Sequence, residues 1–367
     1  MENMRGNGTF QLNGSALLPY EHPFWSTYPP PPREVNVIVG TFVLAVSLIT
    51  IAGNSFVIGF FCRCKSLRTP ANFLLMNLSL SNVLMSVSVP MVTVASYLGE
   101  WPFGEIGCNL HAVMMGGFGL MTINTMAAIA VEKHHSIVKS QTVVSRVSWR
   151  LALKYLAIVW VNSIIWVLPP LFGWGRYILE GLGTACCFDY ITETITNRAF
   201  VVTLFAAGFI CPLSVIVVCY IWIFAHVHNN SHAMKTYRMS SQRKKRISRS
   251  ELKIVKMILV VLMIYIGAWT PYAVVSLMGI FGKANQLDRV TSTIPAMVAK
   301  ASAIYNPLVY IHYHRRFRGE LRRRGIFPCS SASHSSAQNS SYGSKSDSKS
   351  WIRQSALAKQ TSAHHYV

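Results

Sequence analysis

Seven stretches of the chain are free, or nearly free, of Asp, Glu, Lys and Arg, and each is long enough to cross a membrane. Six are entirely free of these residues: Val35–Cys62, Thr69–Gly99, Ile106–Val131, Tyr155–Gly175, Ala199–Met234 and Met257–Gly282. The seventh, Val290–His314, is broken only by Lys300. A spanning helix needs about 20 mostly apolar residues, and seven such stretches are too many for the core of one soluble domain. The pattern predicts an all-α bundle of seven transmembrane helices over residues 35–312.

Lysine and arginine gather on alternate connections between these stretches. They are dense between the fifth and sixth stretches, in residues 235–253, and after the seventh, in residues 315–324. The connections on the other side hold only a few: Arg176, Arg198, Lys283 and Arg289. Basic residues are retained on the cytoplasmic side of a membrane. We therefore expect a multi-pass protein of the plasma membrane, with its N-terminus outside the cell and its C-terminus in the cytoplasm.

The composition agrees with a membrane protein and removes one competing function. Of 367 residues, 51% are hydrophobic and only 13% are charged, while the formal net charge is +21. That charge could indicate nucleic-acid binding, but the basic residues flank the spans, where each is attracted to anionic lipid by about 1 kcal/mol. We expect contact with the lipid bilayer and an acidic cytosolic partner, and no nucleic acid.

The two ends of the chain are polar. Residues 1–34 form a predicted extracellular tail with glycosylation sequons at Asn7 and Asn13, and they lack the pattern of a cleavable signal peptide. Residues 328–367 are rich in serine, which predicts a disordered cytoplasmic tail. Such a tail can accept phosphates, or it can be a plain soluble extension.

Lys300 is the most informative single residue. It has about ten residues of its stretch on either side, which places its Cα roughly 15 Å from each end of a helix. That is too deep for easy snorkelling to the headgroups, and an ionisable residue at this depth marks a functional site. A buried amine is favoured in its neutral, nucleophilic form and can condense with an aldehyde to give a Schiff base. We expect a covalent or ligand-linked role.

Other residues inside the spans give weaker indications. Asparagines in hydrocarbon need partners, so five of them are expected to face the bundle interior: Asn54, Asn82, Asn124, Asn162 and Asn306. Trp269, Tyr272 and Phe281 are expected on the side where a ligand attached to Lys300 would lie. Aromatic residues at helical spacing are more often simple packing residues.

Two cysteines fall where a disulfide can form. Cys108 opens the third stretch and Cys186 lies in the outer loop after the fourth, so a bridge between them is expected. The neighbouring Cys187 is an alternative partner, and position in the sequence does not choose between the two.

Together these features resemble the rhodopsin-like G-protein-coupled receptors and, within them, the animal opsins, over residues 35–327. Motifs similar to those of the receptor superfamily are Gly53-Asn54, Trp160, Pro212 with Tyr220, Trp269-Thr270-Pro271-Tyr272 and Asn306-Pro307-Leu308-Val309-Tyr310. Lys300, six residues before Asn306, narrows the resemblance to opsins. The segment Gly173–Gly181, with the later Cys186 and Asp189-Tyr190, is similar to an opsin second outer loop.

The resemblance implies a retinal chromophore, 11-cis in the dark, bound as a Schiff base to Lys300. The implied pocket residues are His111, Gly119, Trp269, Tyr272 and Ala273. A protonated Schiff base in low dielectric needs a nearby negative charge. His111 stands where vertebrate visual opsins carry a glutamate, whereas Glu180 matches the outer-loop glutamate of invertebrate and bistable opsins. Glu180 is therefore the expected counterion, ahead of Glu105 and Asp189; without the resemblance it would be interpreted as an exposed loop charge.

The resemblance also implies a signalling route. Isomerisation by light strains the pocket, moves the sixth span through Trp269 and opens the cytoplasmic face to a heterotrimeric G protein. The implied switch residues are Glu132, Lys133, His134, Tyr220, Glu251, Asn306, Pro307 and Tyr310. Lys133 replaces the arginine of the family triplet and loses its planar fork. We therefore expect an altered resting contact from Lys133 to Glu132 and Glu251.

The cytoplasmic end carries three further expectations. Residues 313–327 are similar to the short amphipathic cytoplasmic helix of the family, with Phe317 and Leu321 towards lipid. Cys329 is a palmitoylation candidate. The serine-rich tail would serve a receptor kinase and arrestin.

Three alternatives to a light-activated receptor remain open at this point. A retinal photoisomerase would use the same lysine and pocket with weak or no G-protein coupling. A receptor for a diffusible ligand would pair Lys300 with an anionic group. A proton pump is disfavoured, because the spans lack internal Asp or Glu for a relay. With Glu180 as counterion, a receptor would be expected to be bistable, returning to the dark state with a second photon.

Overall fold

The computed structural model describes residues 11–12, 15–16, 18–139, 148–236 and 242–325. The chain divides into two compact units, Met1–Phe317 and Arg318–Val367, and the helices of the first unit carry the site. The predicted modification sites Asn7, Asn13 and Cys329 lie outside the described residues. So does the side chain of Glu251, although its backbone is helical.

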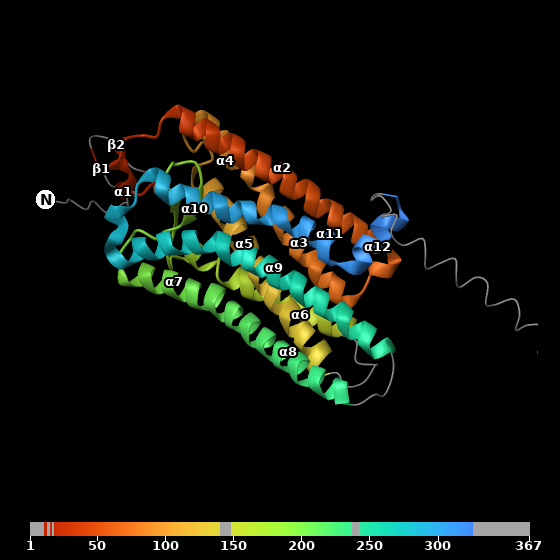
Figure 1. The fold of residues 1–367 in the computed structure, drawn as a ribbon. Helices are drawn as coiled ribbons and strands as arrows, with labels where there is room; N and C mark the ends of the chain where they lie inside the picture. The colour runs from red at the N-terminus through yellow and green to blue at the C-terminus, as the bar shows by residue number, and fades with distance from the viewer. Residues whose placement is uncertain (1–10, 13–14, 17, 140–147, 237–241, 326–367) are drawn as a thin grey trace, which may run out of the picture. The chain divides into compact units, whose positions relative to one another are not determined.

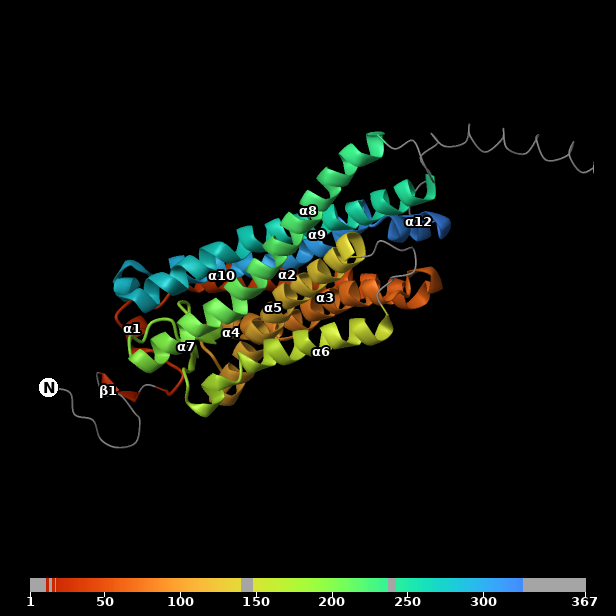
Figure 2. The same cartoon turned by 90° about the horizontal axis from the view of Figure 1, so that it is seen from below.

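Helices that run side by side form the first unit (Figures 1 and 2). They are α2 (Arg33–Arg63), α3 (Pro70–Val87), α4 (Val89–Leu98), α5 (Gly104–His134), α6 (Trp149–Ile165), α7 (Ile195–Phe205), α8 (Cys211–Thr236), α9 (Gln242–Met278), α10 (Arg289–Ala301) and α11 (Tyr305–Tyr313). Single turns join several of them: Ala206–Ile210 connects α7 to α8, and Ser302–Ile304 connects α10 to α11. A final short helix, α12 (Arg315–Arg323), is shorter than the predicted 313–327.

Five helical runs in the described part of the chain meet the length and apolarity of a membrane span: Arg33–Arg63, Pro70–Leu98, Gly104–Val138, Ile195–Asn229 and Val255–Gln286. The other two predicted spans are helical but shorter. Helix α6 has 17 residues and ends before Pro169-Pro170, which begin a 3₁₀ turn. The seventh stretch is interrupted by the 3₁₀ turn between α10 and α11, so neither helix alone is long enough.

One end of the bundle is closed by a small β-hairpin, and we call it the hairpin end. Strand β3 (Tyr177–Leu179) pairs antiparallel with β4 (Cys186–Phe188), with Leu179 opposite Cys186. A disulfide from Cys186 to Cys108 ties β4 to the first turns of α5. The short helix α1 (Pro23–Ser26) belongs to the same end, because Trp25 is buried against hairpin residues.

Two further short strands precede α1. They are β1 (Gln11–Leu12) and β2 (Ser15–Ala16), which pair antiparallel. The N-terminal segment predicted as a polar tail therefore contains local structure at Gln11–Leu12 and Ser15–Ala16.

The predicted interior asparagines do join the helices. Asn54 of α2 donates to the Ala303 carbonyl at 3.3 Å and accepts from Asn82 of α3 at 3.3 Å. Asn124 of α5 accepts from Asn162 of α6 at 3.0 Å. Four of the five predicted asparagines thus make hydrogen bonds between separate segments of the bundle, as hydrocarbon surroundings favour, and the fifth, Asn306, is buried. These bonds join α2 to α3 and to the turn after α10, and they join α5 to α6.

Candidate functional site

A cavity lies between the hairpin and the helices α5, α7, α9 and α10. Its lining includes most of the residues predicted from the sequence: Gly119, Trp269, Tyr272, Ala273, Glu180 and Lys300. The lining is mainly apolar and aromatic, which is typical of a site for a small organic ligand. The structure thus brings the solitary lysine, the loop glutamate and the tryptophan of the sixth span to one place.

Two predicted positions lie elsewhere. His111 is fully buried but does not line this cavity; its ring packs on Trp101, with ring centroids 5.8 Å apart. Phe281 is 63% exposed and falls beyond Met278, the last residue of α9. Phe281 follows Tyr272 by nine residues, about two and a half helical turns, so the two side chains would have faced opposite sides even in an unbroken helix.

Lys300 lies one residue before the end of α10. It is partly accessible, because it faces the cavity. Ala296 and Ala299 of the same helix also line the cavity, and their small side chains leave room beside the amine. Among the described residues no carboxylate forms an ion pair with Lys300 at short distance.

Glu180 follows β3 and is held by its own backbone. Its N–H donates to the Ala185 carbonyl at 2.8 Å, and its carbonyl accepts from Gly183 at 2.7 Å, closing a tight turn. The side chain is buried, and its Oε1 atom has no hydrogen-bond partner. Burial raises the pKa of Glu180 to about 7, and the positive charge of Lys300 opposes that rise. An orphaned carboxylate oxygen close to an amine is what a counterion site requires.

The other two counterion candidates are placed differently. Asp189 is buried, but Arg176 contacts it at 2.6 Å and Thr192 donates to it at 2.6 Å. Burial opposes its ionisation, and these partners more than offset that effect, so the pKa of Asp189 lies below its usual value. Glu105 is exposed in the first turn of α5 and does not line the cavity.

The cysteine question is resolved in the structure. Cys108 and Cys186 form the disulfide, with Cα atoms 5.3 Å apart, and Cys187 is a free, buried thiol that lines the cavity. Successive residues of a strand point to opposite faces, so Cys186 points towards α5 and Cys187 away from it, although parts of both residues line the cavity. Burial raises the pKa of Cys187 well above its usual value, with Glu180 adding to the rise.

Helix α9 is coupled to α5 at the floor of the cavity. The Tyr265 hydroxyl donates to the Gly119 carbonyl at 3.2 Å, and the Tyr265 ring stacks on Trp269 with centroids 5.3 Å apart. A Cβ on Gly119 would lie 2.9 Å from Trp269, so only glycine lets the indole approach α5 this closely.

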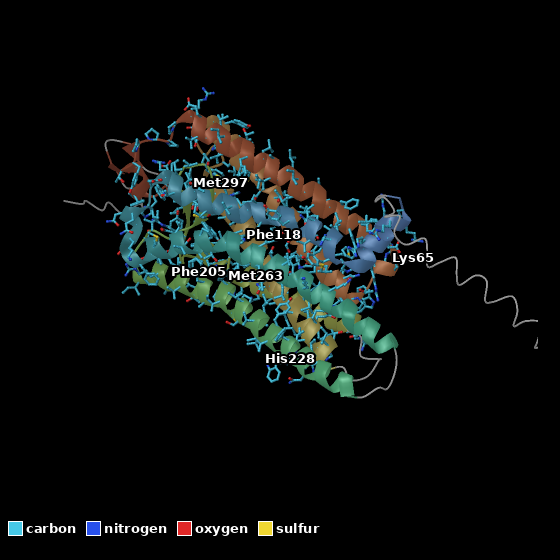
Figure 3. The ribbon with its side chains drawn as sticks, viewed as in Figure 1. Lys65, Phe118, Phe205, His228, Met263 and Met297 are labelled. Atoms are coloured by element: carbon cyan, nitrogen blue, oxygen red, sulfur yellow. A yellow bond between two sulfur atoms is a disulfide. The ribbon has the colours of Figure 1, made fainter. Side chains whose placement is uncertain are left out.

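Sequence reasoning missed several lining residues. Tyr265, Cys187, Phe188 and Phe205 all face the cavity, and Figure 3 labels Phe205 on α7. Tyr265 precedes Trp269 by four residues, one helical turn, which is the one sequence signal that could have found it.

Glu132, Lys133 and His134 lie at the other end of the bundle, where α5 ends; we call it the switch end. Glu132 and Lys133 are both buried, and Lys133 Nζ lies 2.9 Å from Glu132 Oε2. Asn306 and Tyr310 of α11 are also buried, whereas His134 is partly exposed as the last residue of α5. The adjacent residues Glu132 and Lys133 therefore pair with each other.

Comparisons with known proteins agree with this geometry. Residues 53–310 match the family described as 7 transmembrane receptor (rhodopsin family). A protein named "Rhodopsin, GQ-coupled" from Mizuhopecten yessoensis is 36% identical over 87% of this chain and 66% of its own length. Melanopsin of Phodopus sungorus is 36% identical over 90% of this chain and 74% of its own. The crystal structure of squid rhodopsin superposes with a TM-score of 0.78 at 33% identity, covering 83% of this chain and 89% of that one.

These relatives are receptors rather than enzymes, and they give no support to the photoisomerase alternative. The match to a seven-transmembrane receptor confirms the predicted fold class. Family, fold and pocket lead to the same conclusion. The chain belongs to the rhodopsin family of seven-transmembrane receptors and, within it, to the animal opsins.

Proposed function

We propose that this opsin is a light-activated receptor in which retinal is attached to Lys300 as a Schiff base and Glu180 is its counterion. The observation that carries the proposal is the single cavity lined by Lys300, Glu180 and Trp269. The expected arrangement in the plasma membrane places the hairpin end outside the cell and the switch end in the cytoplasm.

The residues present fit a retinal group. The cavity offers a lysine for attachment, a mainly apolar and aromatic wall for a polyene, and an unpartnered buried oxygen on Glu180 for a positive charge. Retinal, when bound, supplies visible absorption and a light-driven change of shape. The dark isomer we propose is 11-cis.

The chain's own groups make the attachment possible. Lys300 would hold retinal through its amine, with the aldehyde oxygen lost as water. Once it takes up a proton, this linkage would carry a positive charge close to Glu180, and that charge would favour the ionised carboxylate over the protonated form that burial alone promotes. The hairpin and its disulfide cover this end of the cavity and limit the access of water.

The contacts between α5 and α9 supply a route for the signal. A shape change in the cavity presses on Trp269, which leans on Gly119 and stacks on Tyr265. Displacing Trp269 would shift Tyr265 and break its bond to the Gly119 carbonyl. Pro271 within α9 removes one backbone hydrogen bond and weakens the helix nearby. Helix α9 can then move as one of two discrete states.

The partner we propose is a heterotrimeric G protein of the Gq class. The support is the name of one relative, "Rhodopsin, GQ-coupled", together with the buried Glu132–Lys133 pair at the switch end. A receptor kinase and arrestin would act on the serine-rich tail.

The test is reconstitution of the purified protein with 11-cis-retinal, with absorption spectra recorded in the dark and after illumination. We expect a visible band in the wild type and in Lys283→Ala, whose lysine is exposed beyond α9, and none in Lys300→Ala. Illumination should drive nucleotide exchange on a Gq-class G protein. Absence of any band beyond free retinal would remove the pigment claim, whereas a band without light-dependent exchange would leave only an isomerase. Return of the dark spectrum under a second wavelength would show bistability.

A further inference from the structure

Arg289, the first residue of α10, joins three segments of the hairpin end. Its guanidinium donates to the carbonyl of Gly181 at 3.0 Å and to the carbonyls of Trp25 and Tyr28. Gly181 follows the counterion candidate Glu180 directly, and the other two acceptors belong to the N-terminal segment around α1. One side chain thus holds this segment and the loop of the hairpin on the start of α10.

The loop fits against α10 without spare room. A Cβ on Gly181 would lie 2.3 Å from the Arg289 carbonyl oxygen and 2.4 Å from the Ser292 hydroxyl. The next residue, Leu182, donates its N–H to the Thr293 hydroxyl at 3.3 Å. Leu182 also packs in an apolar cluster with Met297 of α10, which is labelled in Figure 3. The loop that carries Glu180 is therefore seated on the first turns of the helix that carries Lys300.

Because the loop is attached to the first turns of α10, this helix also sets the position of Lys300 relative to the loop. Its start is fixed by Asp288, whose carboxylate accepts from the N–H groups of Val290 and Thr291 at 2.8 and 2.7 Å. Lys300 follows Arg289 by eleven residues, which is about three full helical turns. The two residues therefore lie on the same face of α10, with Glu180 held near that face by the loop.

We propose that Arg289 is a positioning residue that sets the separation of Glu180 and Lys300 by clamping Gly181 onto α10. This inference rests on the proposed function, because it concerns the counterion of the retinal linkage. The clamp is mechanical: the acceptors of Arg289 are uncharged carbonyls. The titratable groups that face Glu180 are Lys300 of α10, Cys187 of β4, Tyr190 of the loop and Tyr272 of α9, and Arg289 is not one of them.

The test compares pigments by their absorption maximum and by the pH at which the visible band is lost. In Arg289→Ala the loop is released, so Glu180 stabilises the positive linkage less. We expect the midpoint pH to fall by about one unit and the absorption maximum to move to longer wavelength. Thr293→Val removes the acceptor of Leu182 with little change in volume, and should shift both quantities in the same direction by less.

Two further variants separate the clamp from its charge. Arg289→Lys keeps the charge but cannot bridge two carbonyls with a planar fork, so it should resemble Arg289→Ala. Arg198→Ala removes a charge at the same end, where Arg198 pairs with the exposed Glu193 at 2.6 Å, and should match the wild type.

If Arg289→Ala and Thr293→Val both keep the absorption maximum and midpoint pH of the wild type, the proposal is overturned. It is also overturned if Arg289→Lys has the wild-type values of both quantities, because the effect would then belong to the charge. If Arg289→Ala yields no folded protein, the absorption maximum and midpoint pH of Thr293→Val test the proposal instead. A wild type that forms no pigment contradicts the proposed function instead, so the two failures are distinguishable.

Discussion

The two ends of the bundle use buried charge in opposite ways. At the hairpin end, Glu180 and Lys300 line one cavity but the Glu180 carboxylate keeps an unpartnered oxygen. At the switch end, Glu132 and Lys133 are in direct contact at 2.9 Å. The first arrangement leaves space and charge for a ligand, whereas the second places two opposite charges against each other inside the protein.

This difference distinguishes a ligand-binding site from an ion pair that stabilises the resting conformation. A buried charge without a partner destabilises the fold, and such a charge is retained where a bound ligand of opposite charge offsets that penalty. A buried ion pair whose two charges are in contact favours one conformation and must be broken to leave it. In the proposed mechanism the hairpin end receives the stimulus, and the switch end sets how readily the receptor responds.

The largest effect should come from opening the hairpin end. Cys108→Ala removes the bridge to Cys186, and loss of a native disulfide costs roughly 2 to 5 kcal/mol. We expect a lower unfolding temperature in detergent and little pigment. Cys187→Ala, which removes a free thiol from the next position, should keep its stability. Equal unfolding temperatures for the two variants would contradict the role given to the disulfide.

Removing the charge of the counterion should be the next largest effect. Glu180→Gln keeps the shape of the side chain but leaves the positive linkage without its partner. The midpoint pH of the visible band should fall by about one to three units, as measured by titrating the dark pigment. Glu193→Gln, at an exposed carboxylate of the same end, serves as the control. A midpoint that stays unchanged in Glu180→Gln would show that another group is the counterion.

The empty protein gives a separate test through pH. Without retinal, burial holds the pKa of Glu180 at about 7 instead of 4.5. Between these values the folded state binds more protons than the unfolded chain, so the free energy of unfolding should decrease as the pH rises from about 4.5 to 7. The total change is at most about 3 kcal/mol. Unfolding temperatures measured across this window should show the decline in wild type and a flatter profile in Glu180→Gln; identical profiles would contradict the burial argument.

The smallest effect is expected at the switch end. Lys133→Arg restores a planar fork and strengthens the contact with Glu132 by about 1 kcal/mol. That corresponds to roughly five-fold less nucleotide exchange in the dark. Lys154→Arg, at an exposed position of α6, should leave the dark rate unchanged. A higher dark rate in Lys133→Arg would mean that the pair does not stabilise the resting state.

Helix content and the importance of Lys300 could be predicted from the sequence, because charge-free runs and a solitary lysine follow directly from the cost of burying charge. Glu180 and most of the other pocket residues were expected only from the resemblance to opsins. The ends of the helices could not be predicted in this way. Pro169-Pro170 shorten α6, and the turn at Ser302–Ile304 divides the seventh stretch. Both depend on local backbone geometry, which an apolar run does not encode.

The contacts of the hairpin end were also beyond sequence reasoning. The roles of Arg289 and Gly181 depend on a contact between residues more than a hundred positions apart. Arg289 appeared in the sequence only as one of the few basic residues of the outer loops. The choice between Cys186 and Cys187 likewise required the strand, since its alternation decides which sulfur faces α5.

The central claim is a covalent bond between retinal and one amine. Borohydride reduction after incubation with 11-cis-retinal, followed by proteolysis and mass spectrometry, locates that bond directly. The account predicts a retinyl adduct on the peptide that contains Lys300. An adduct on another lysine, or no adduct in a correctly folded protein, would contradict it.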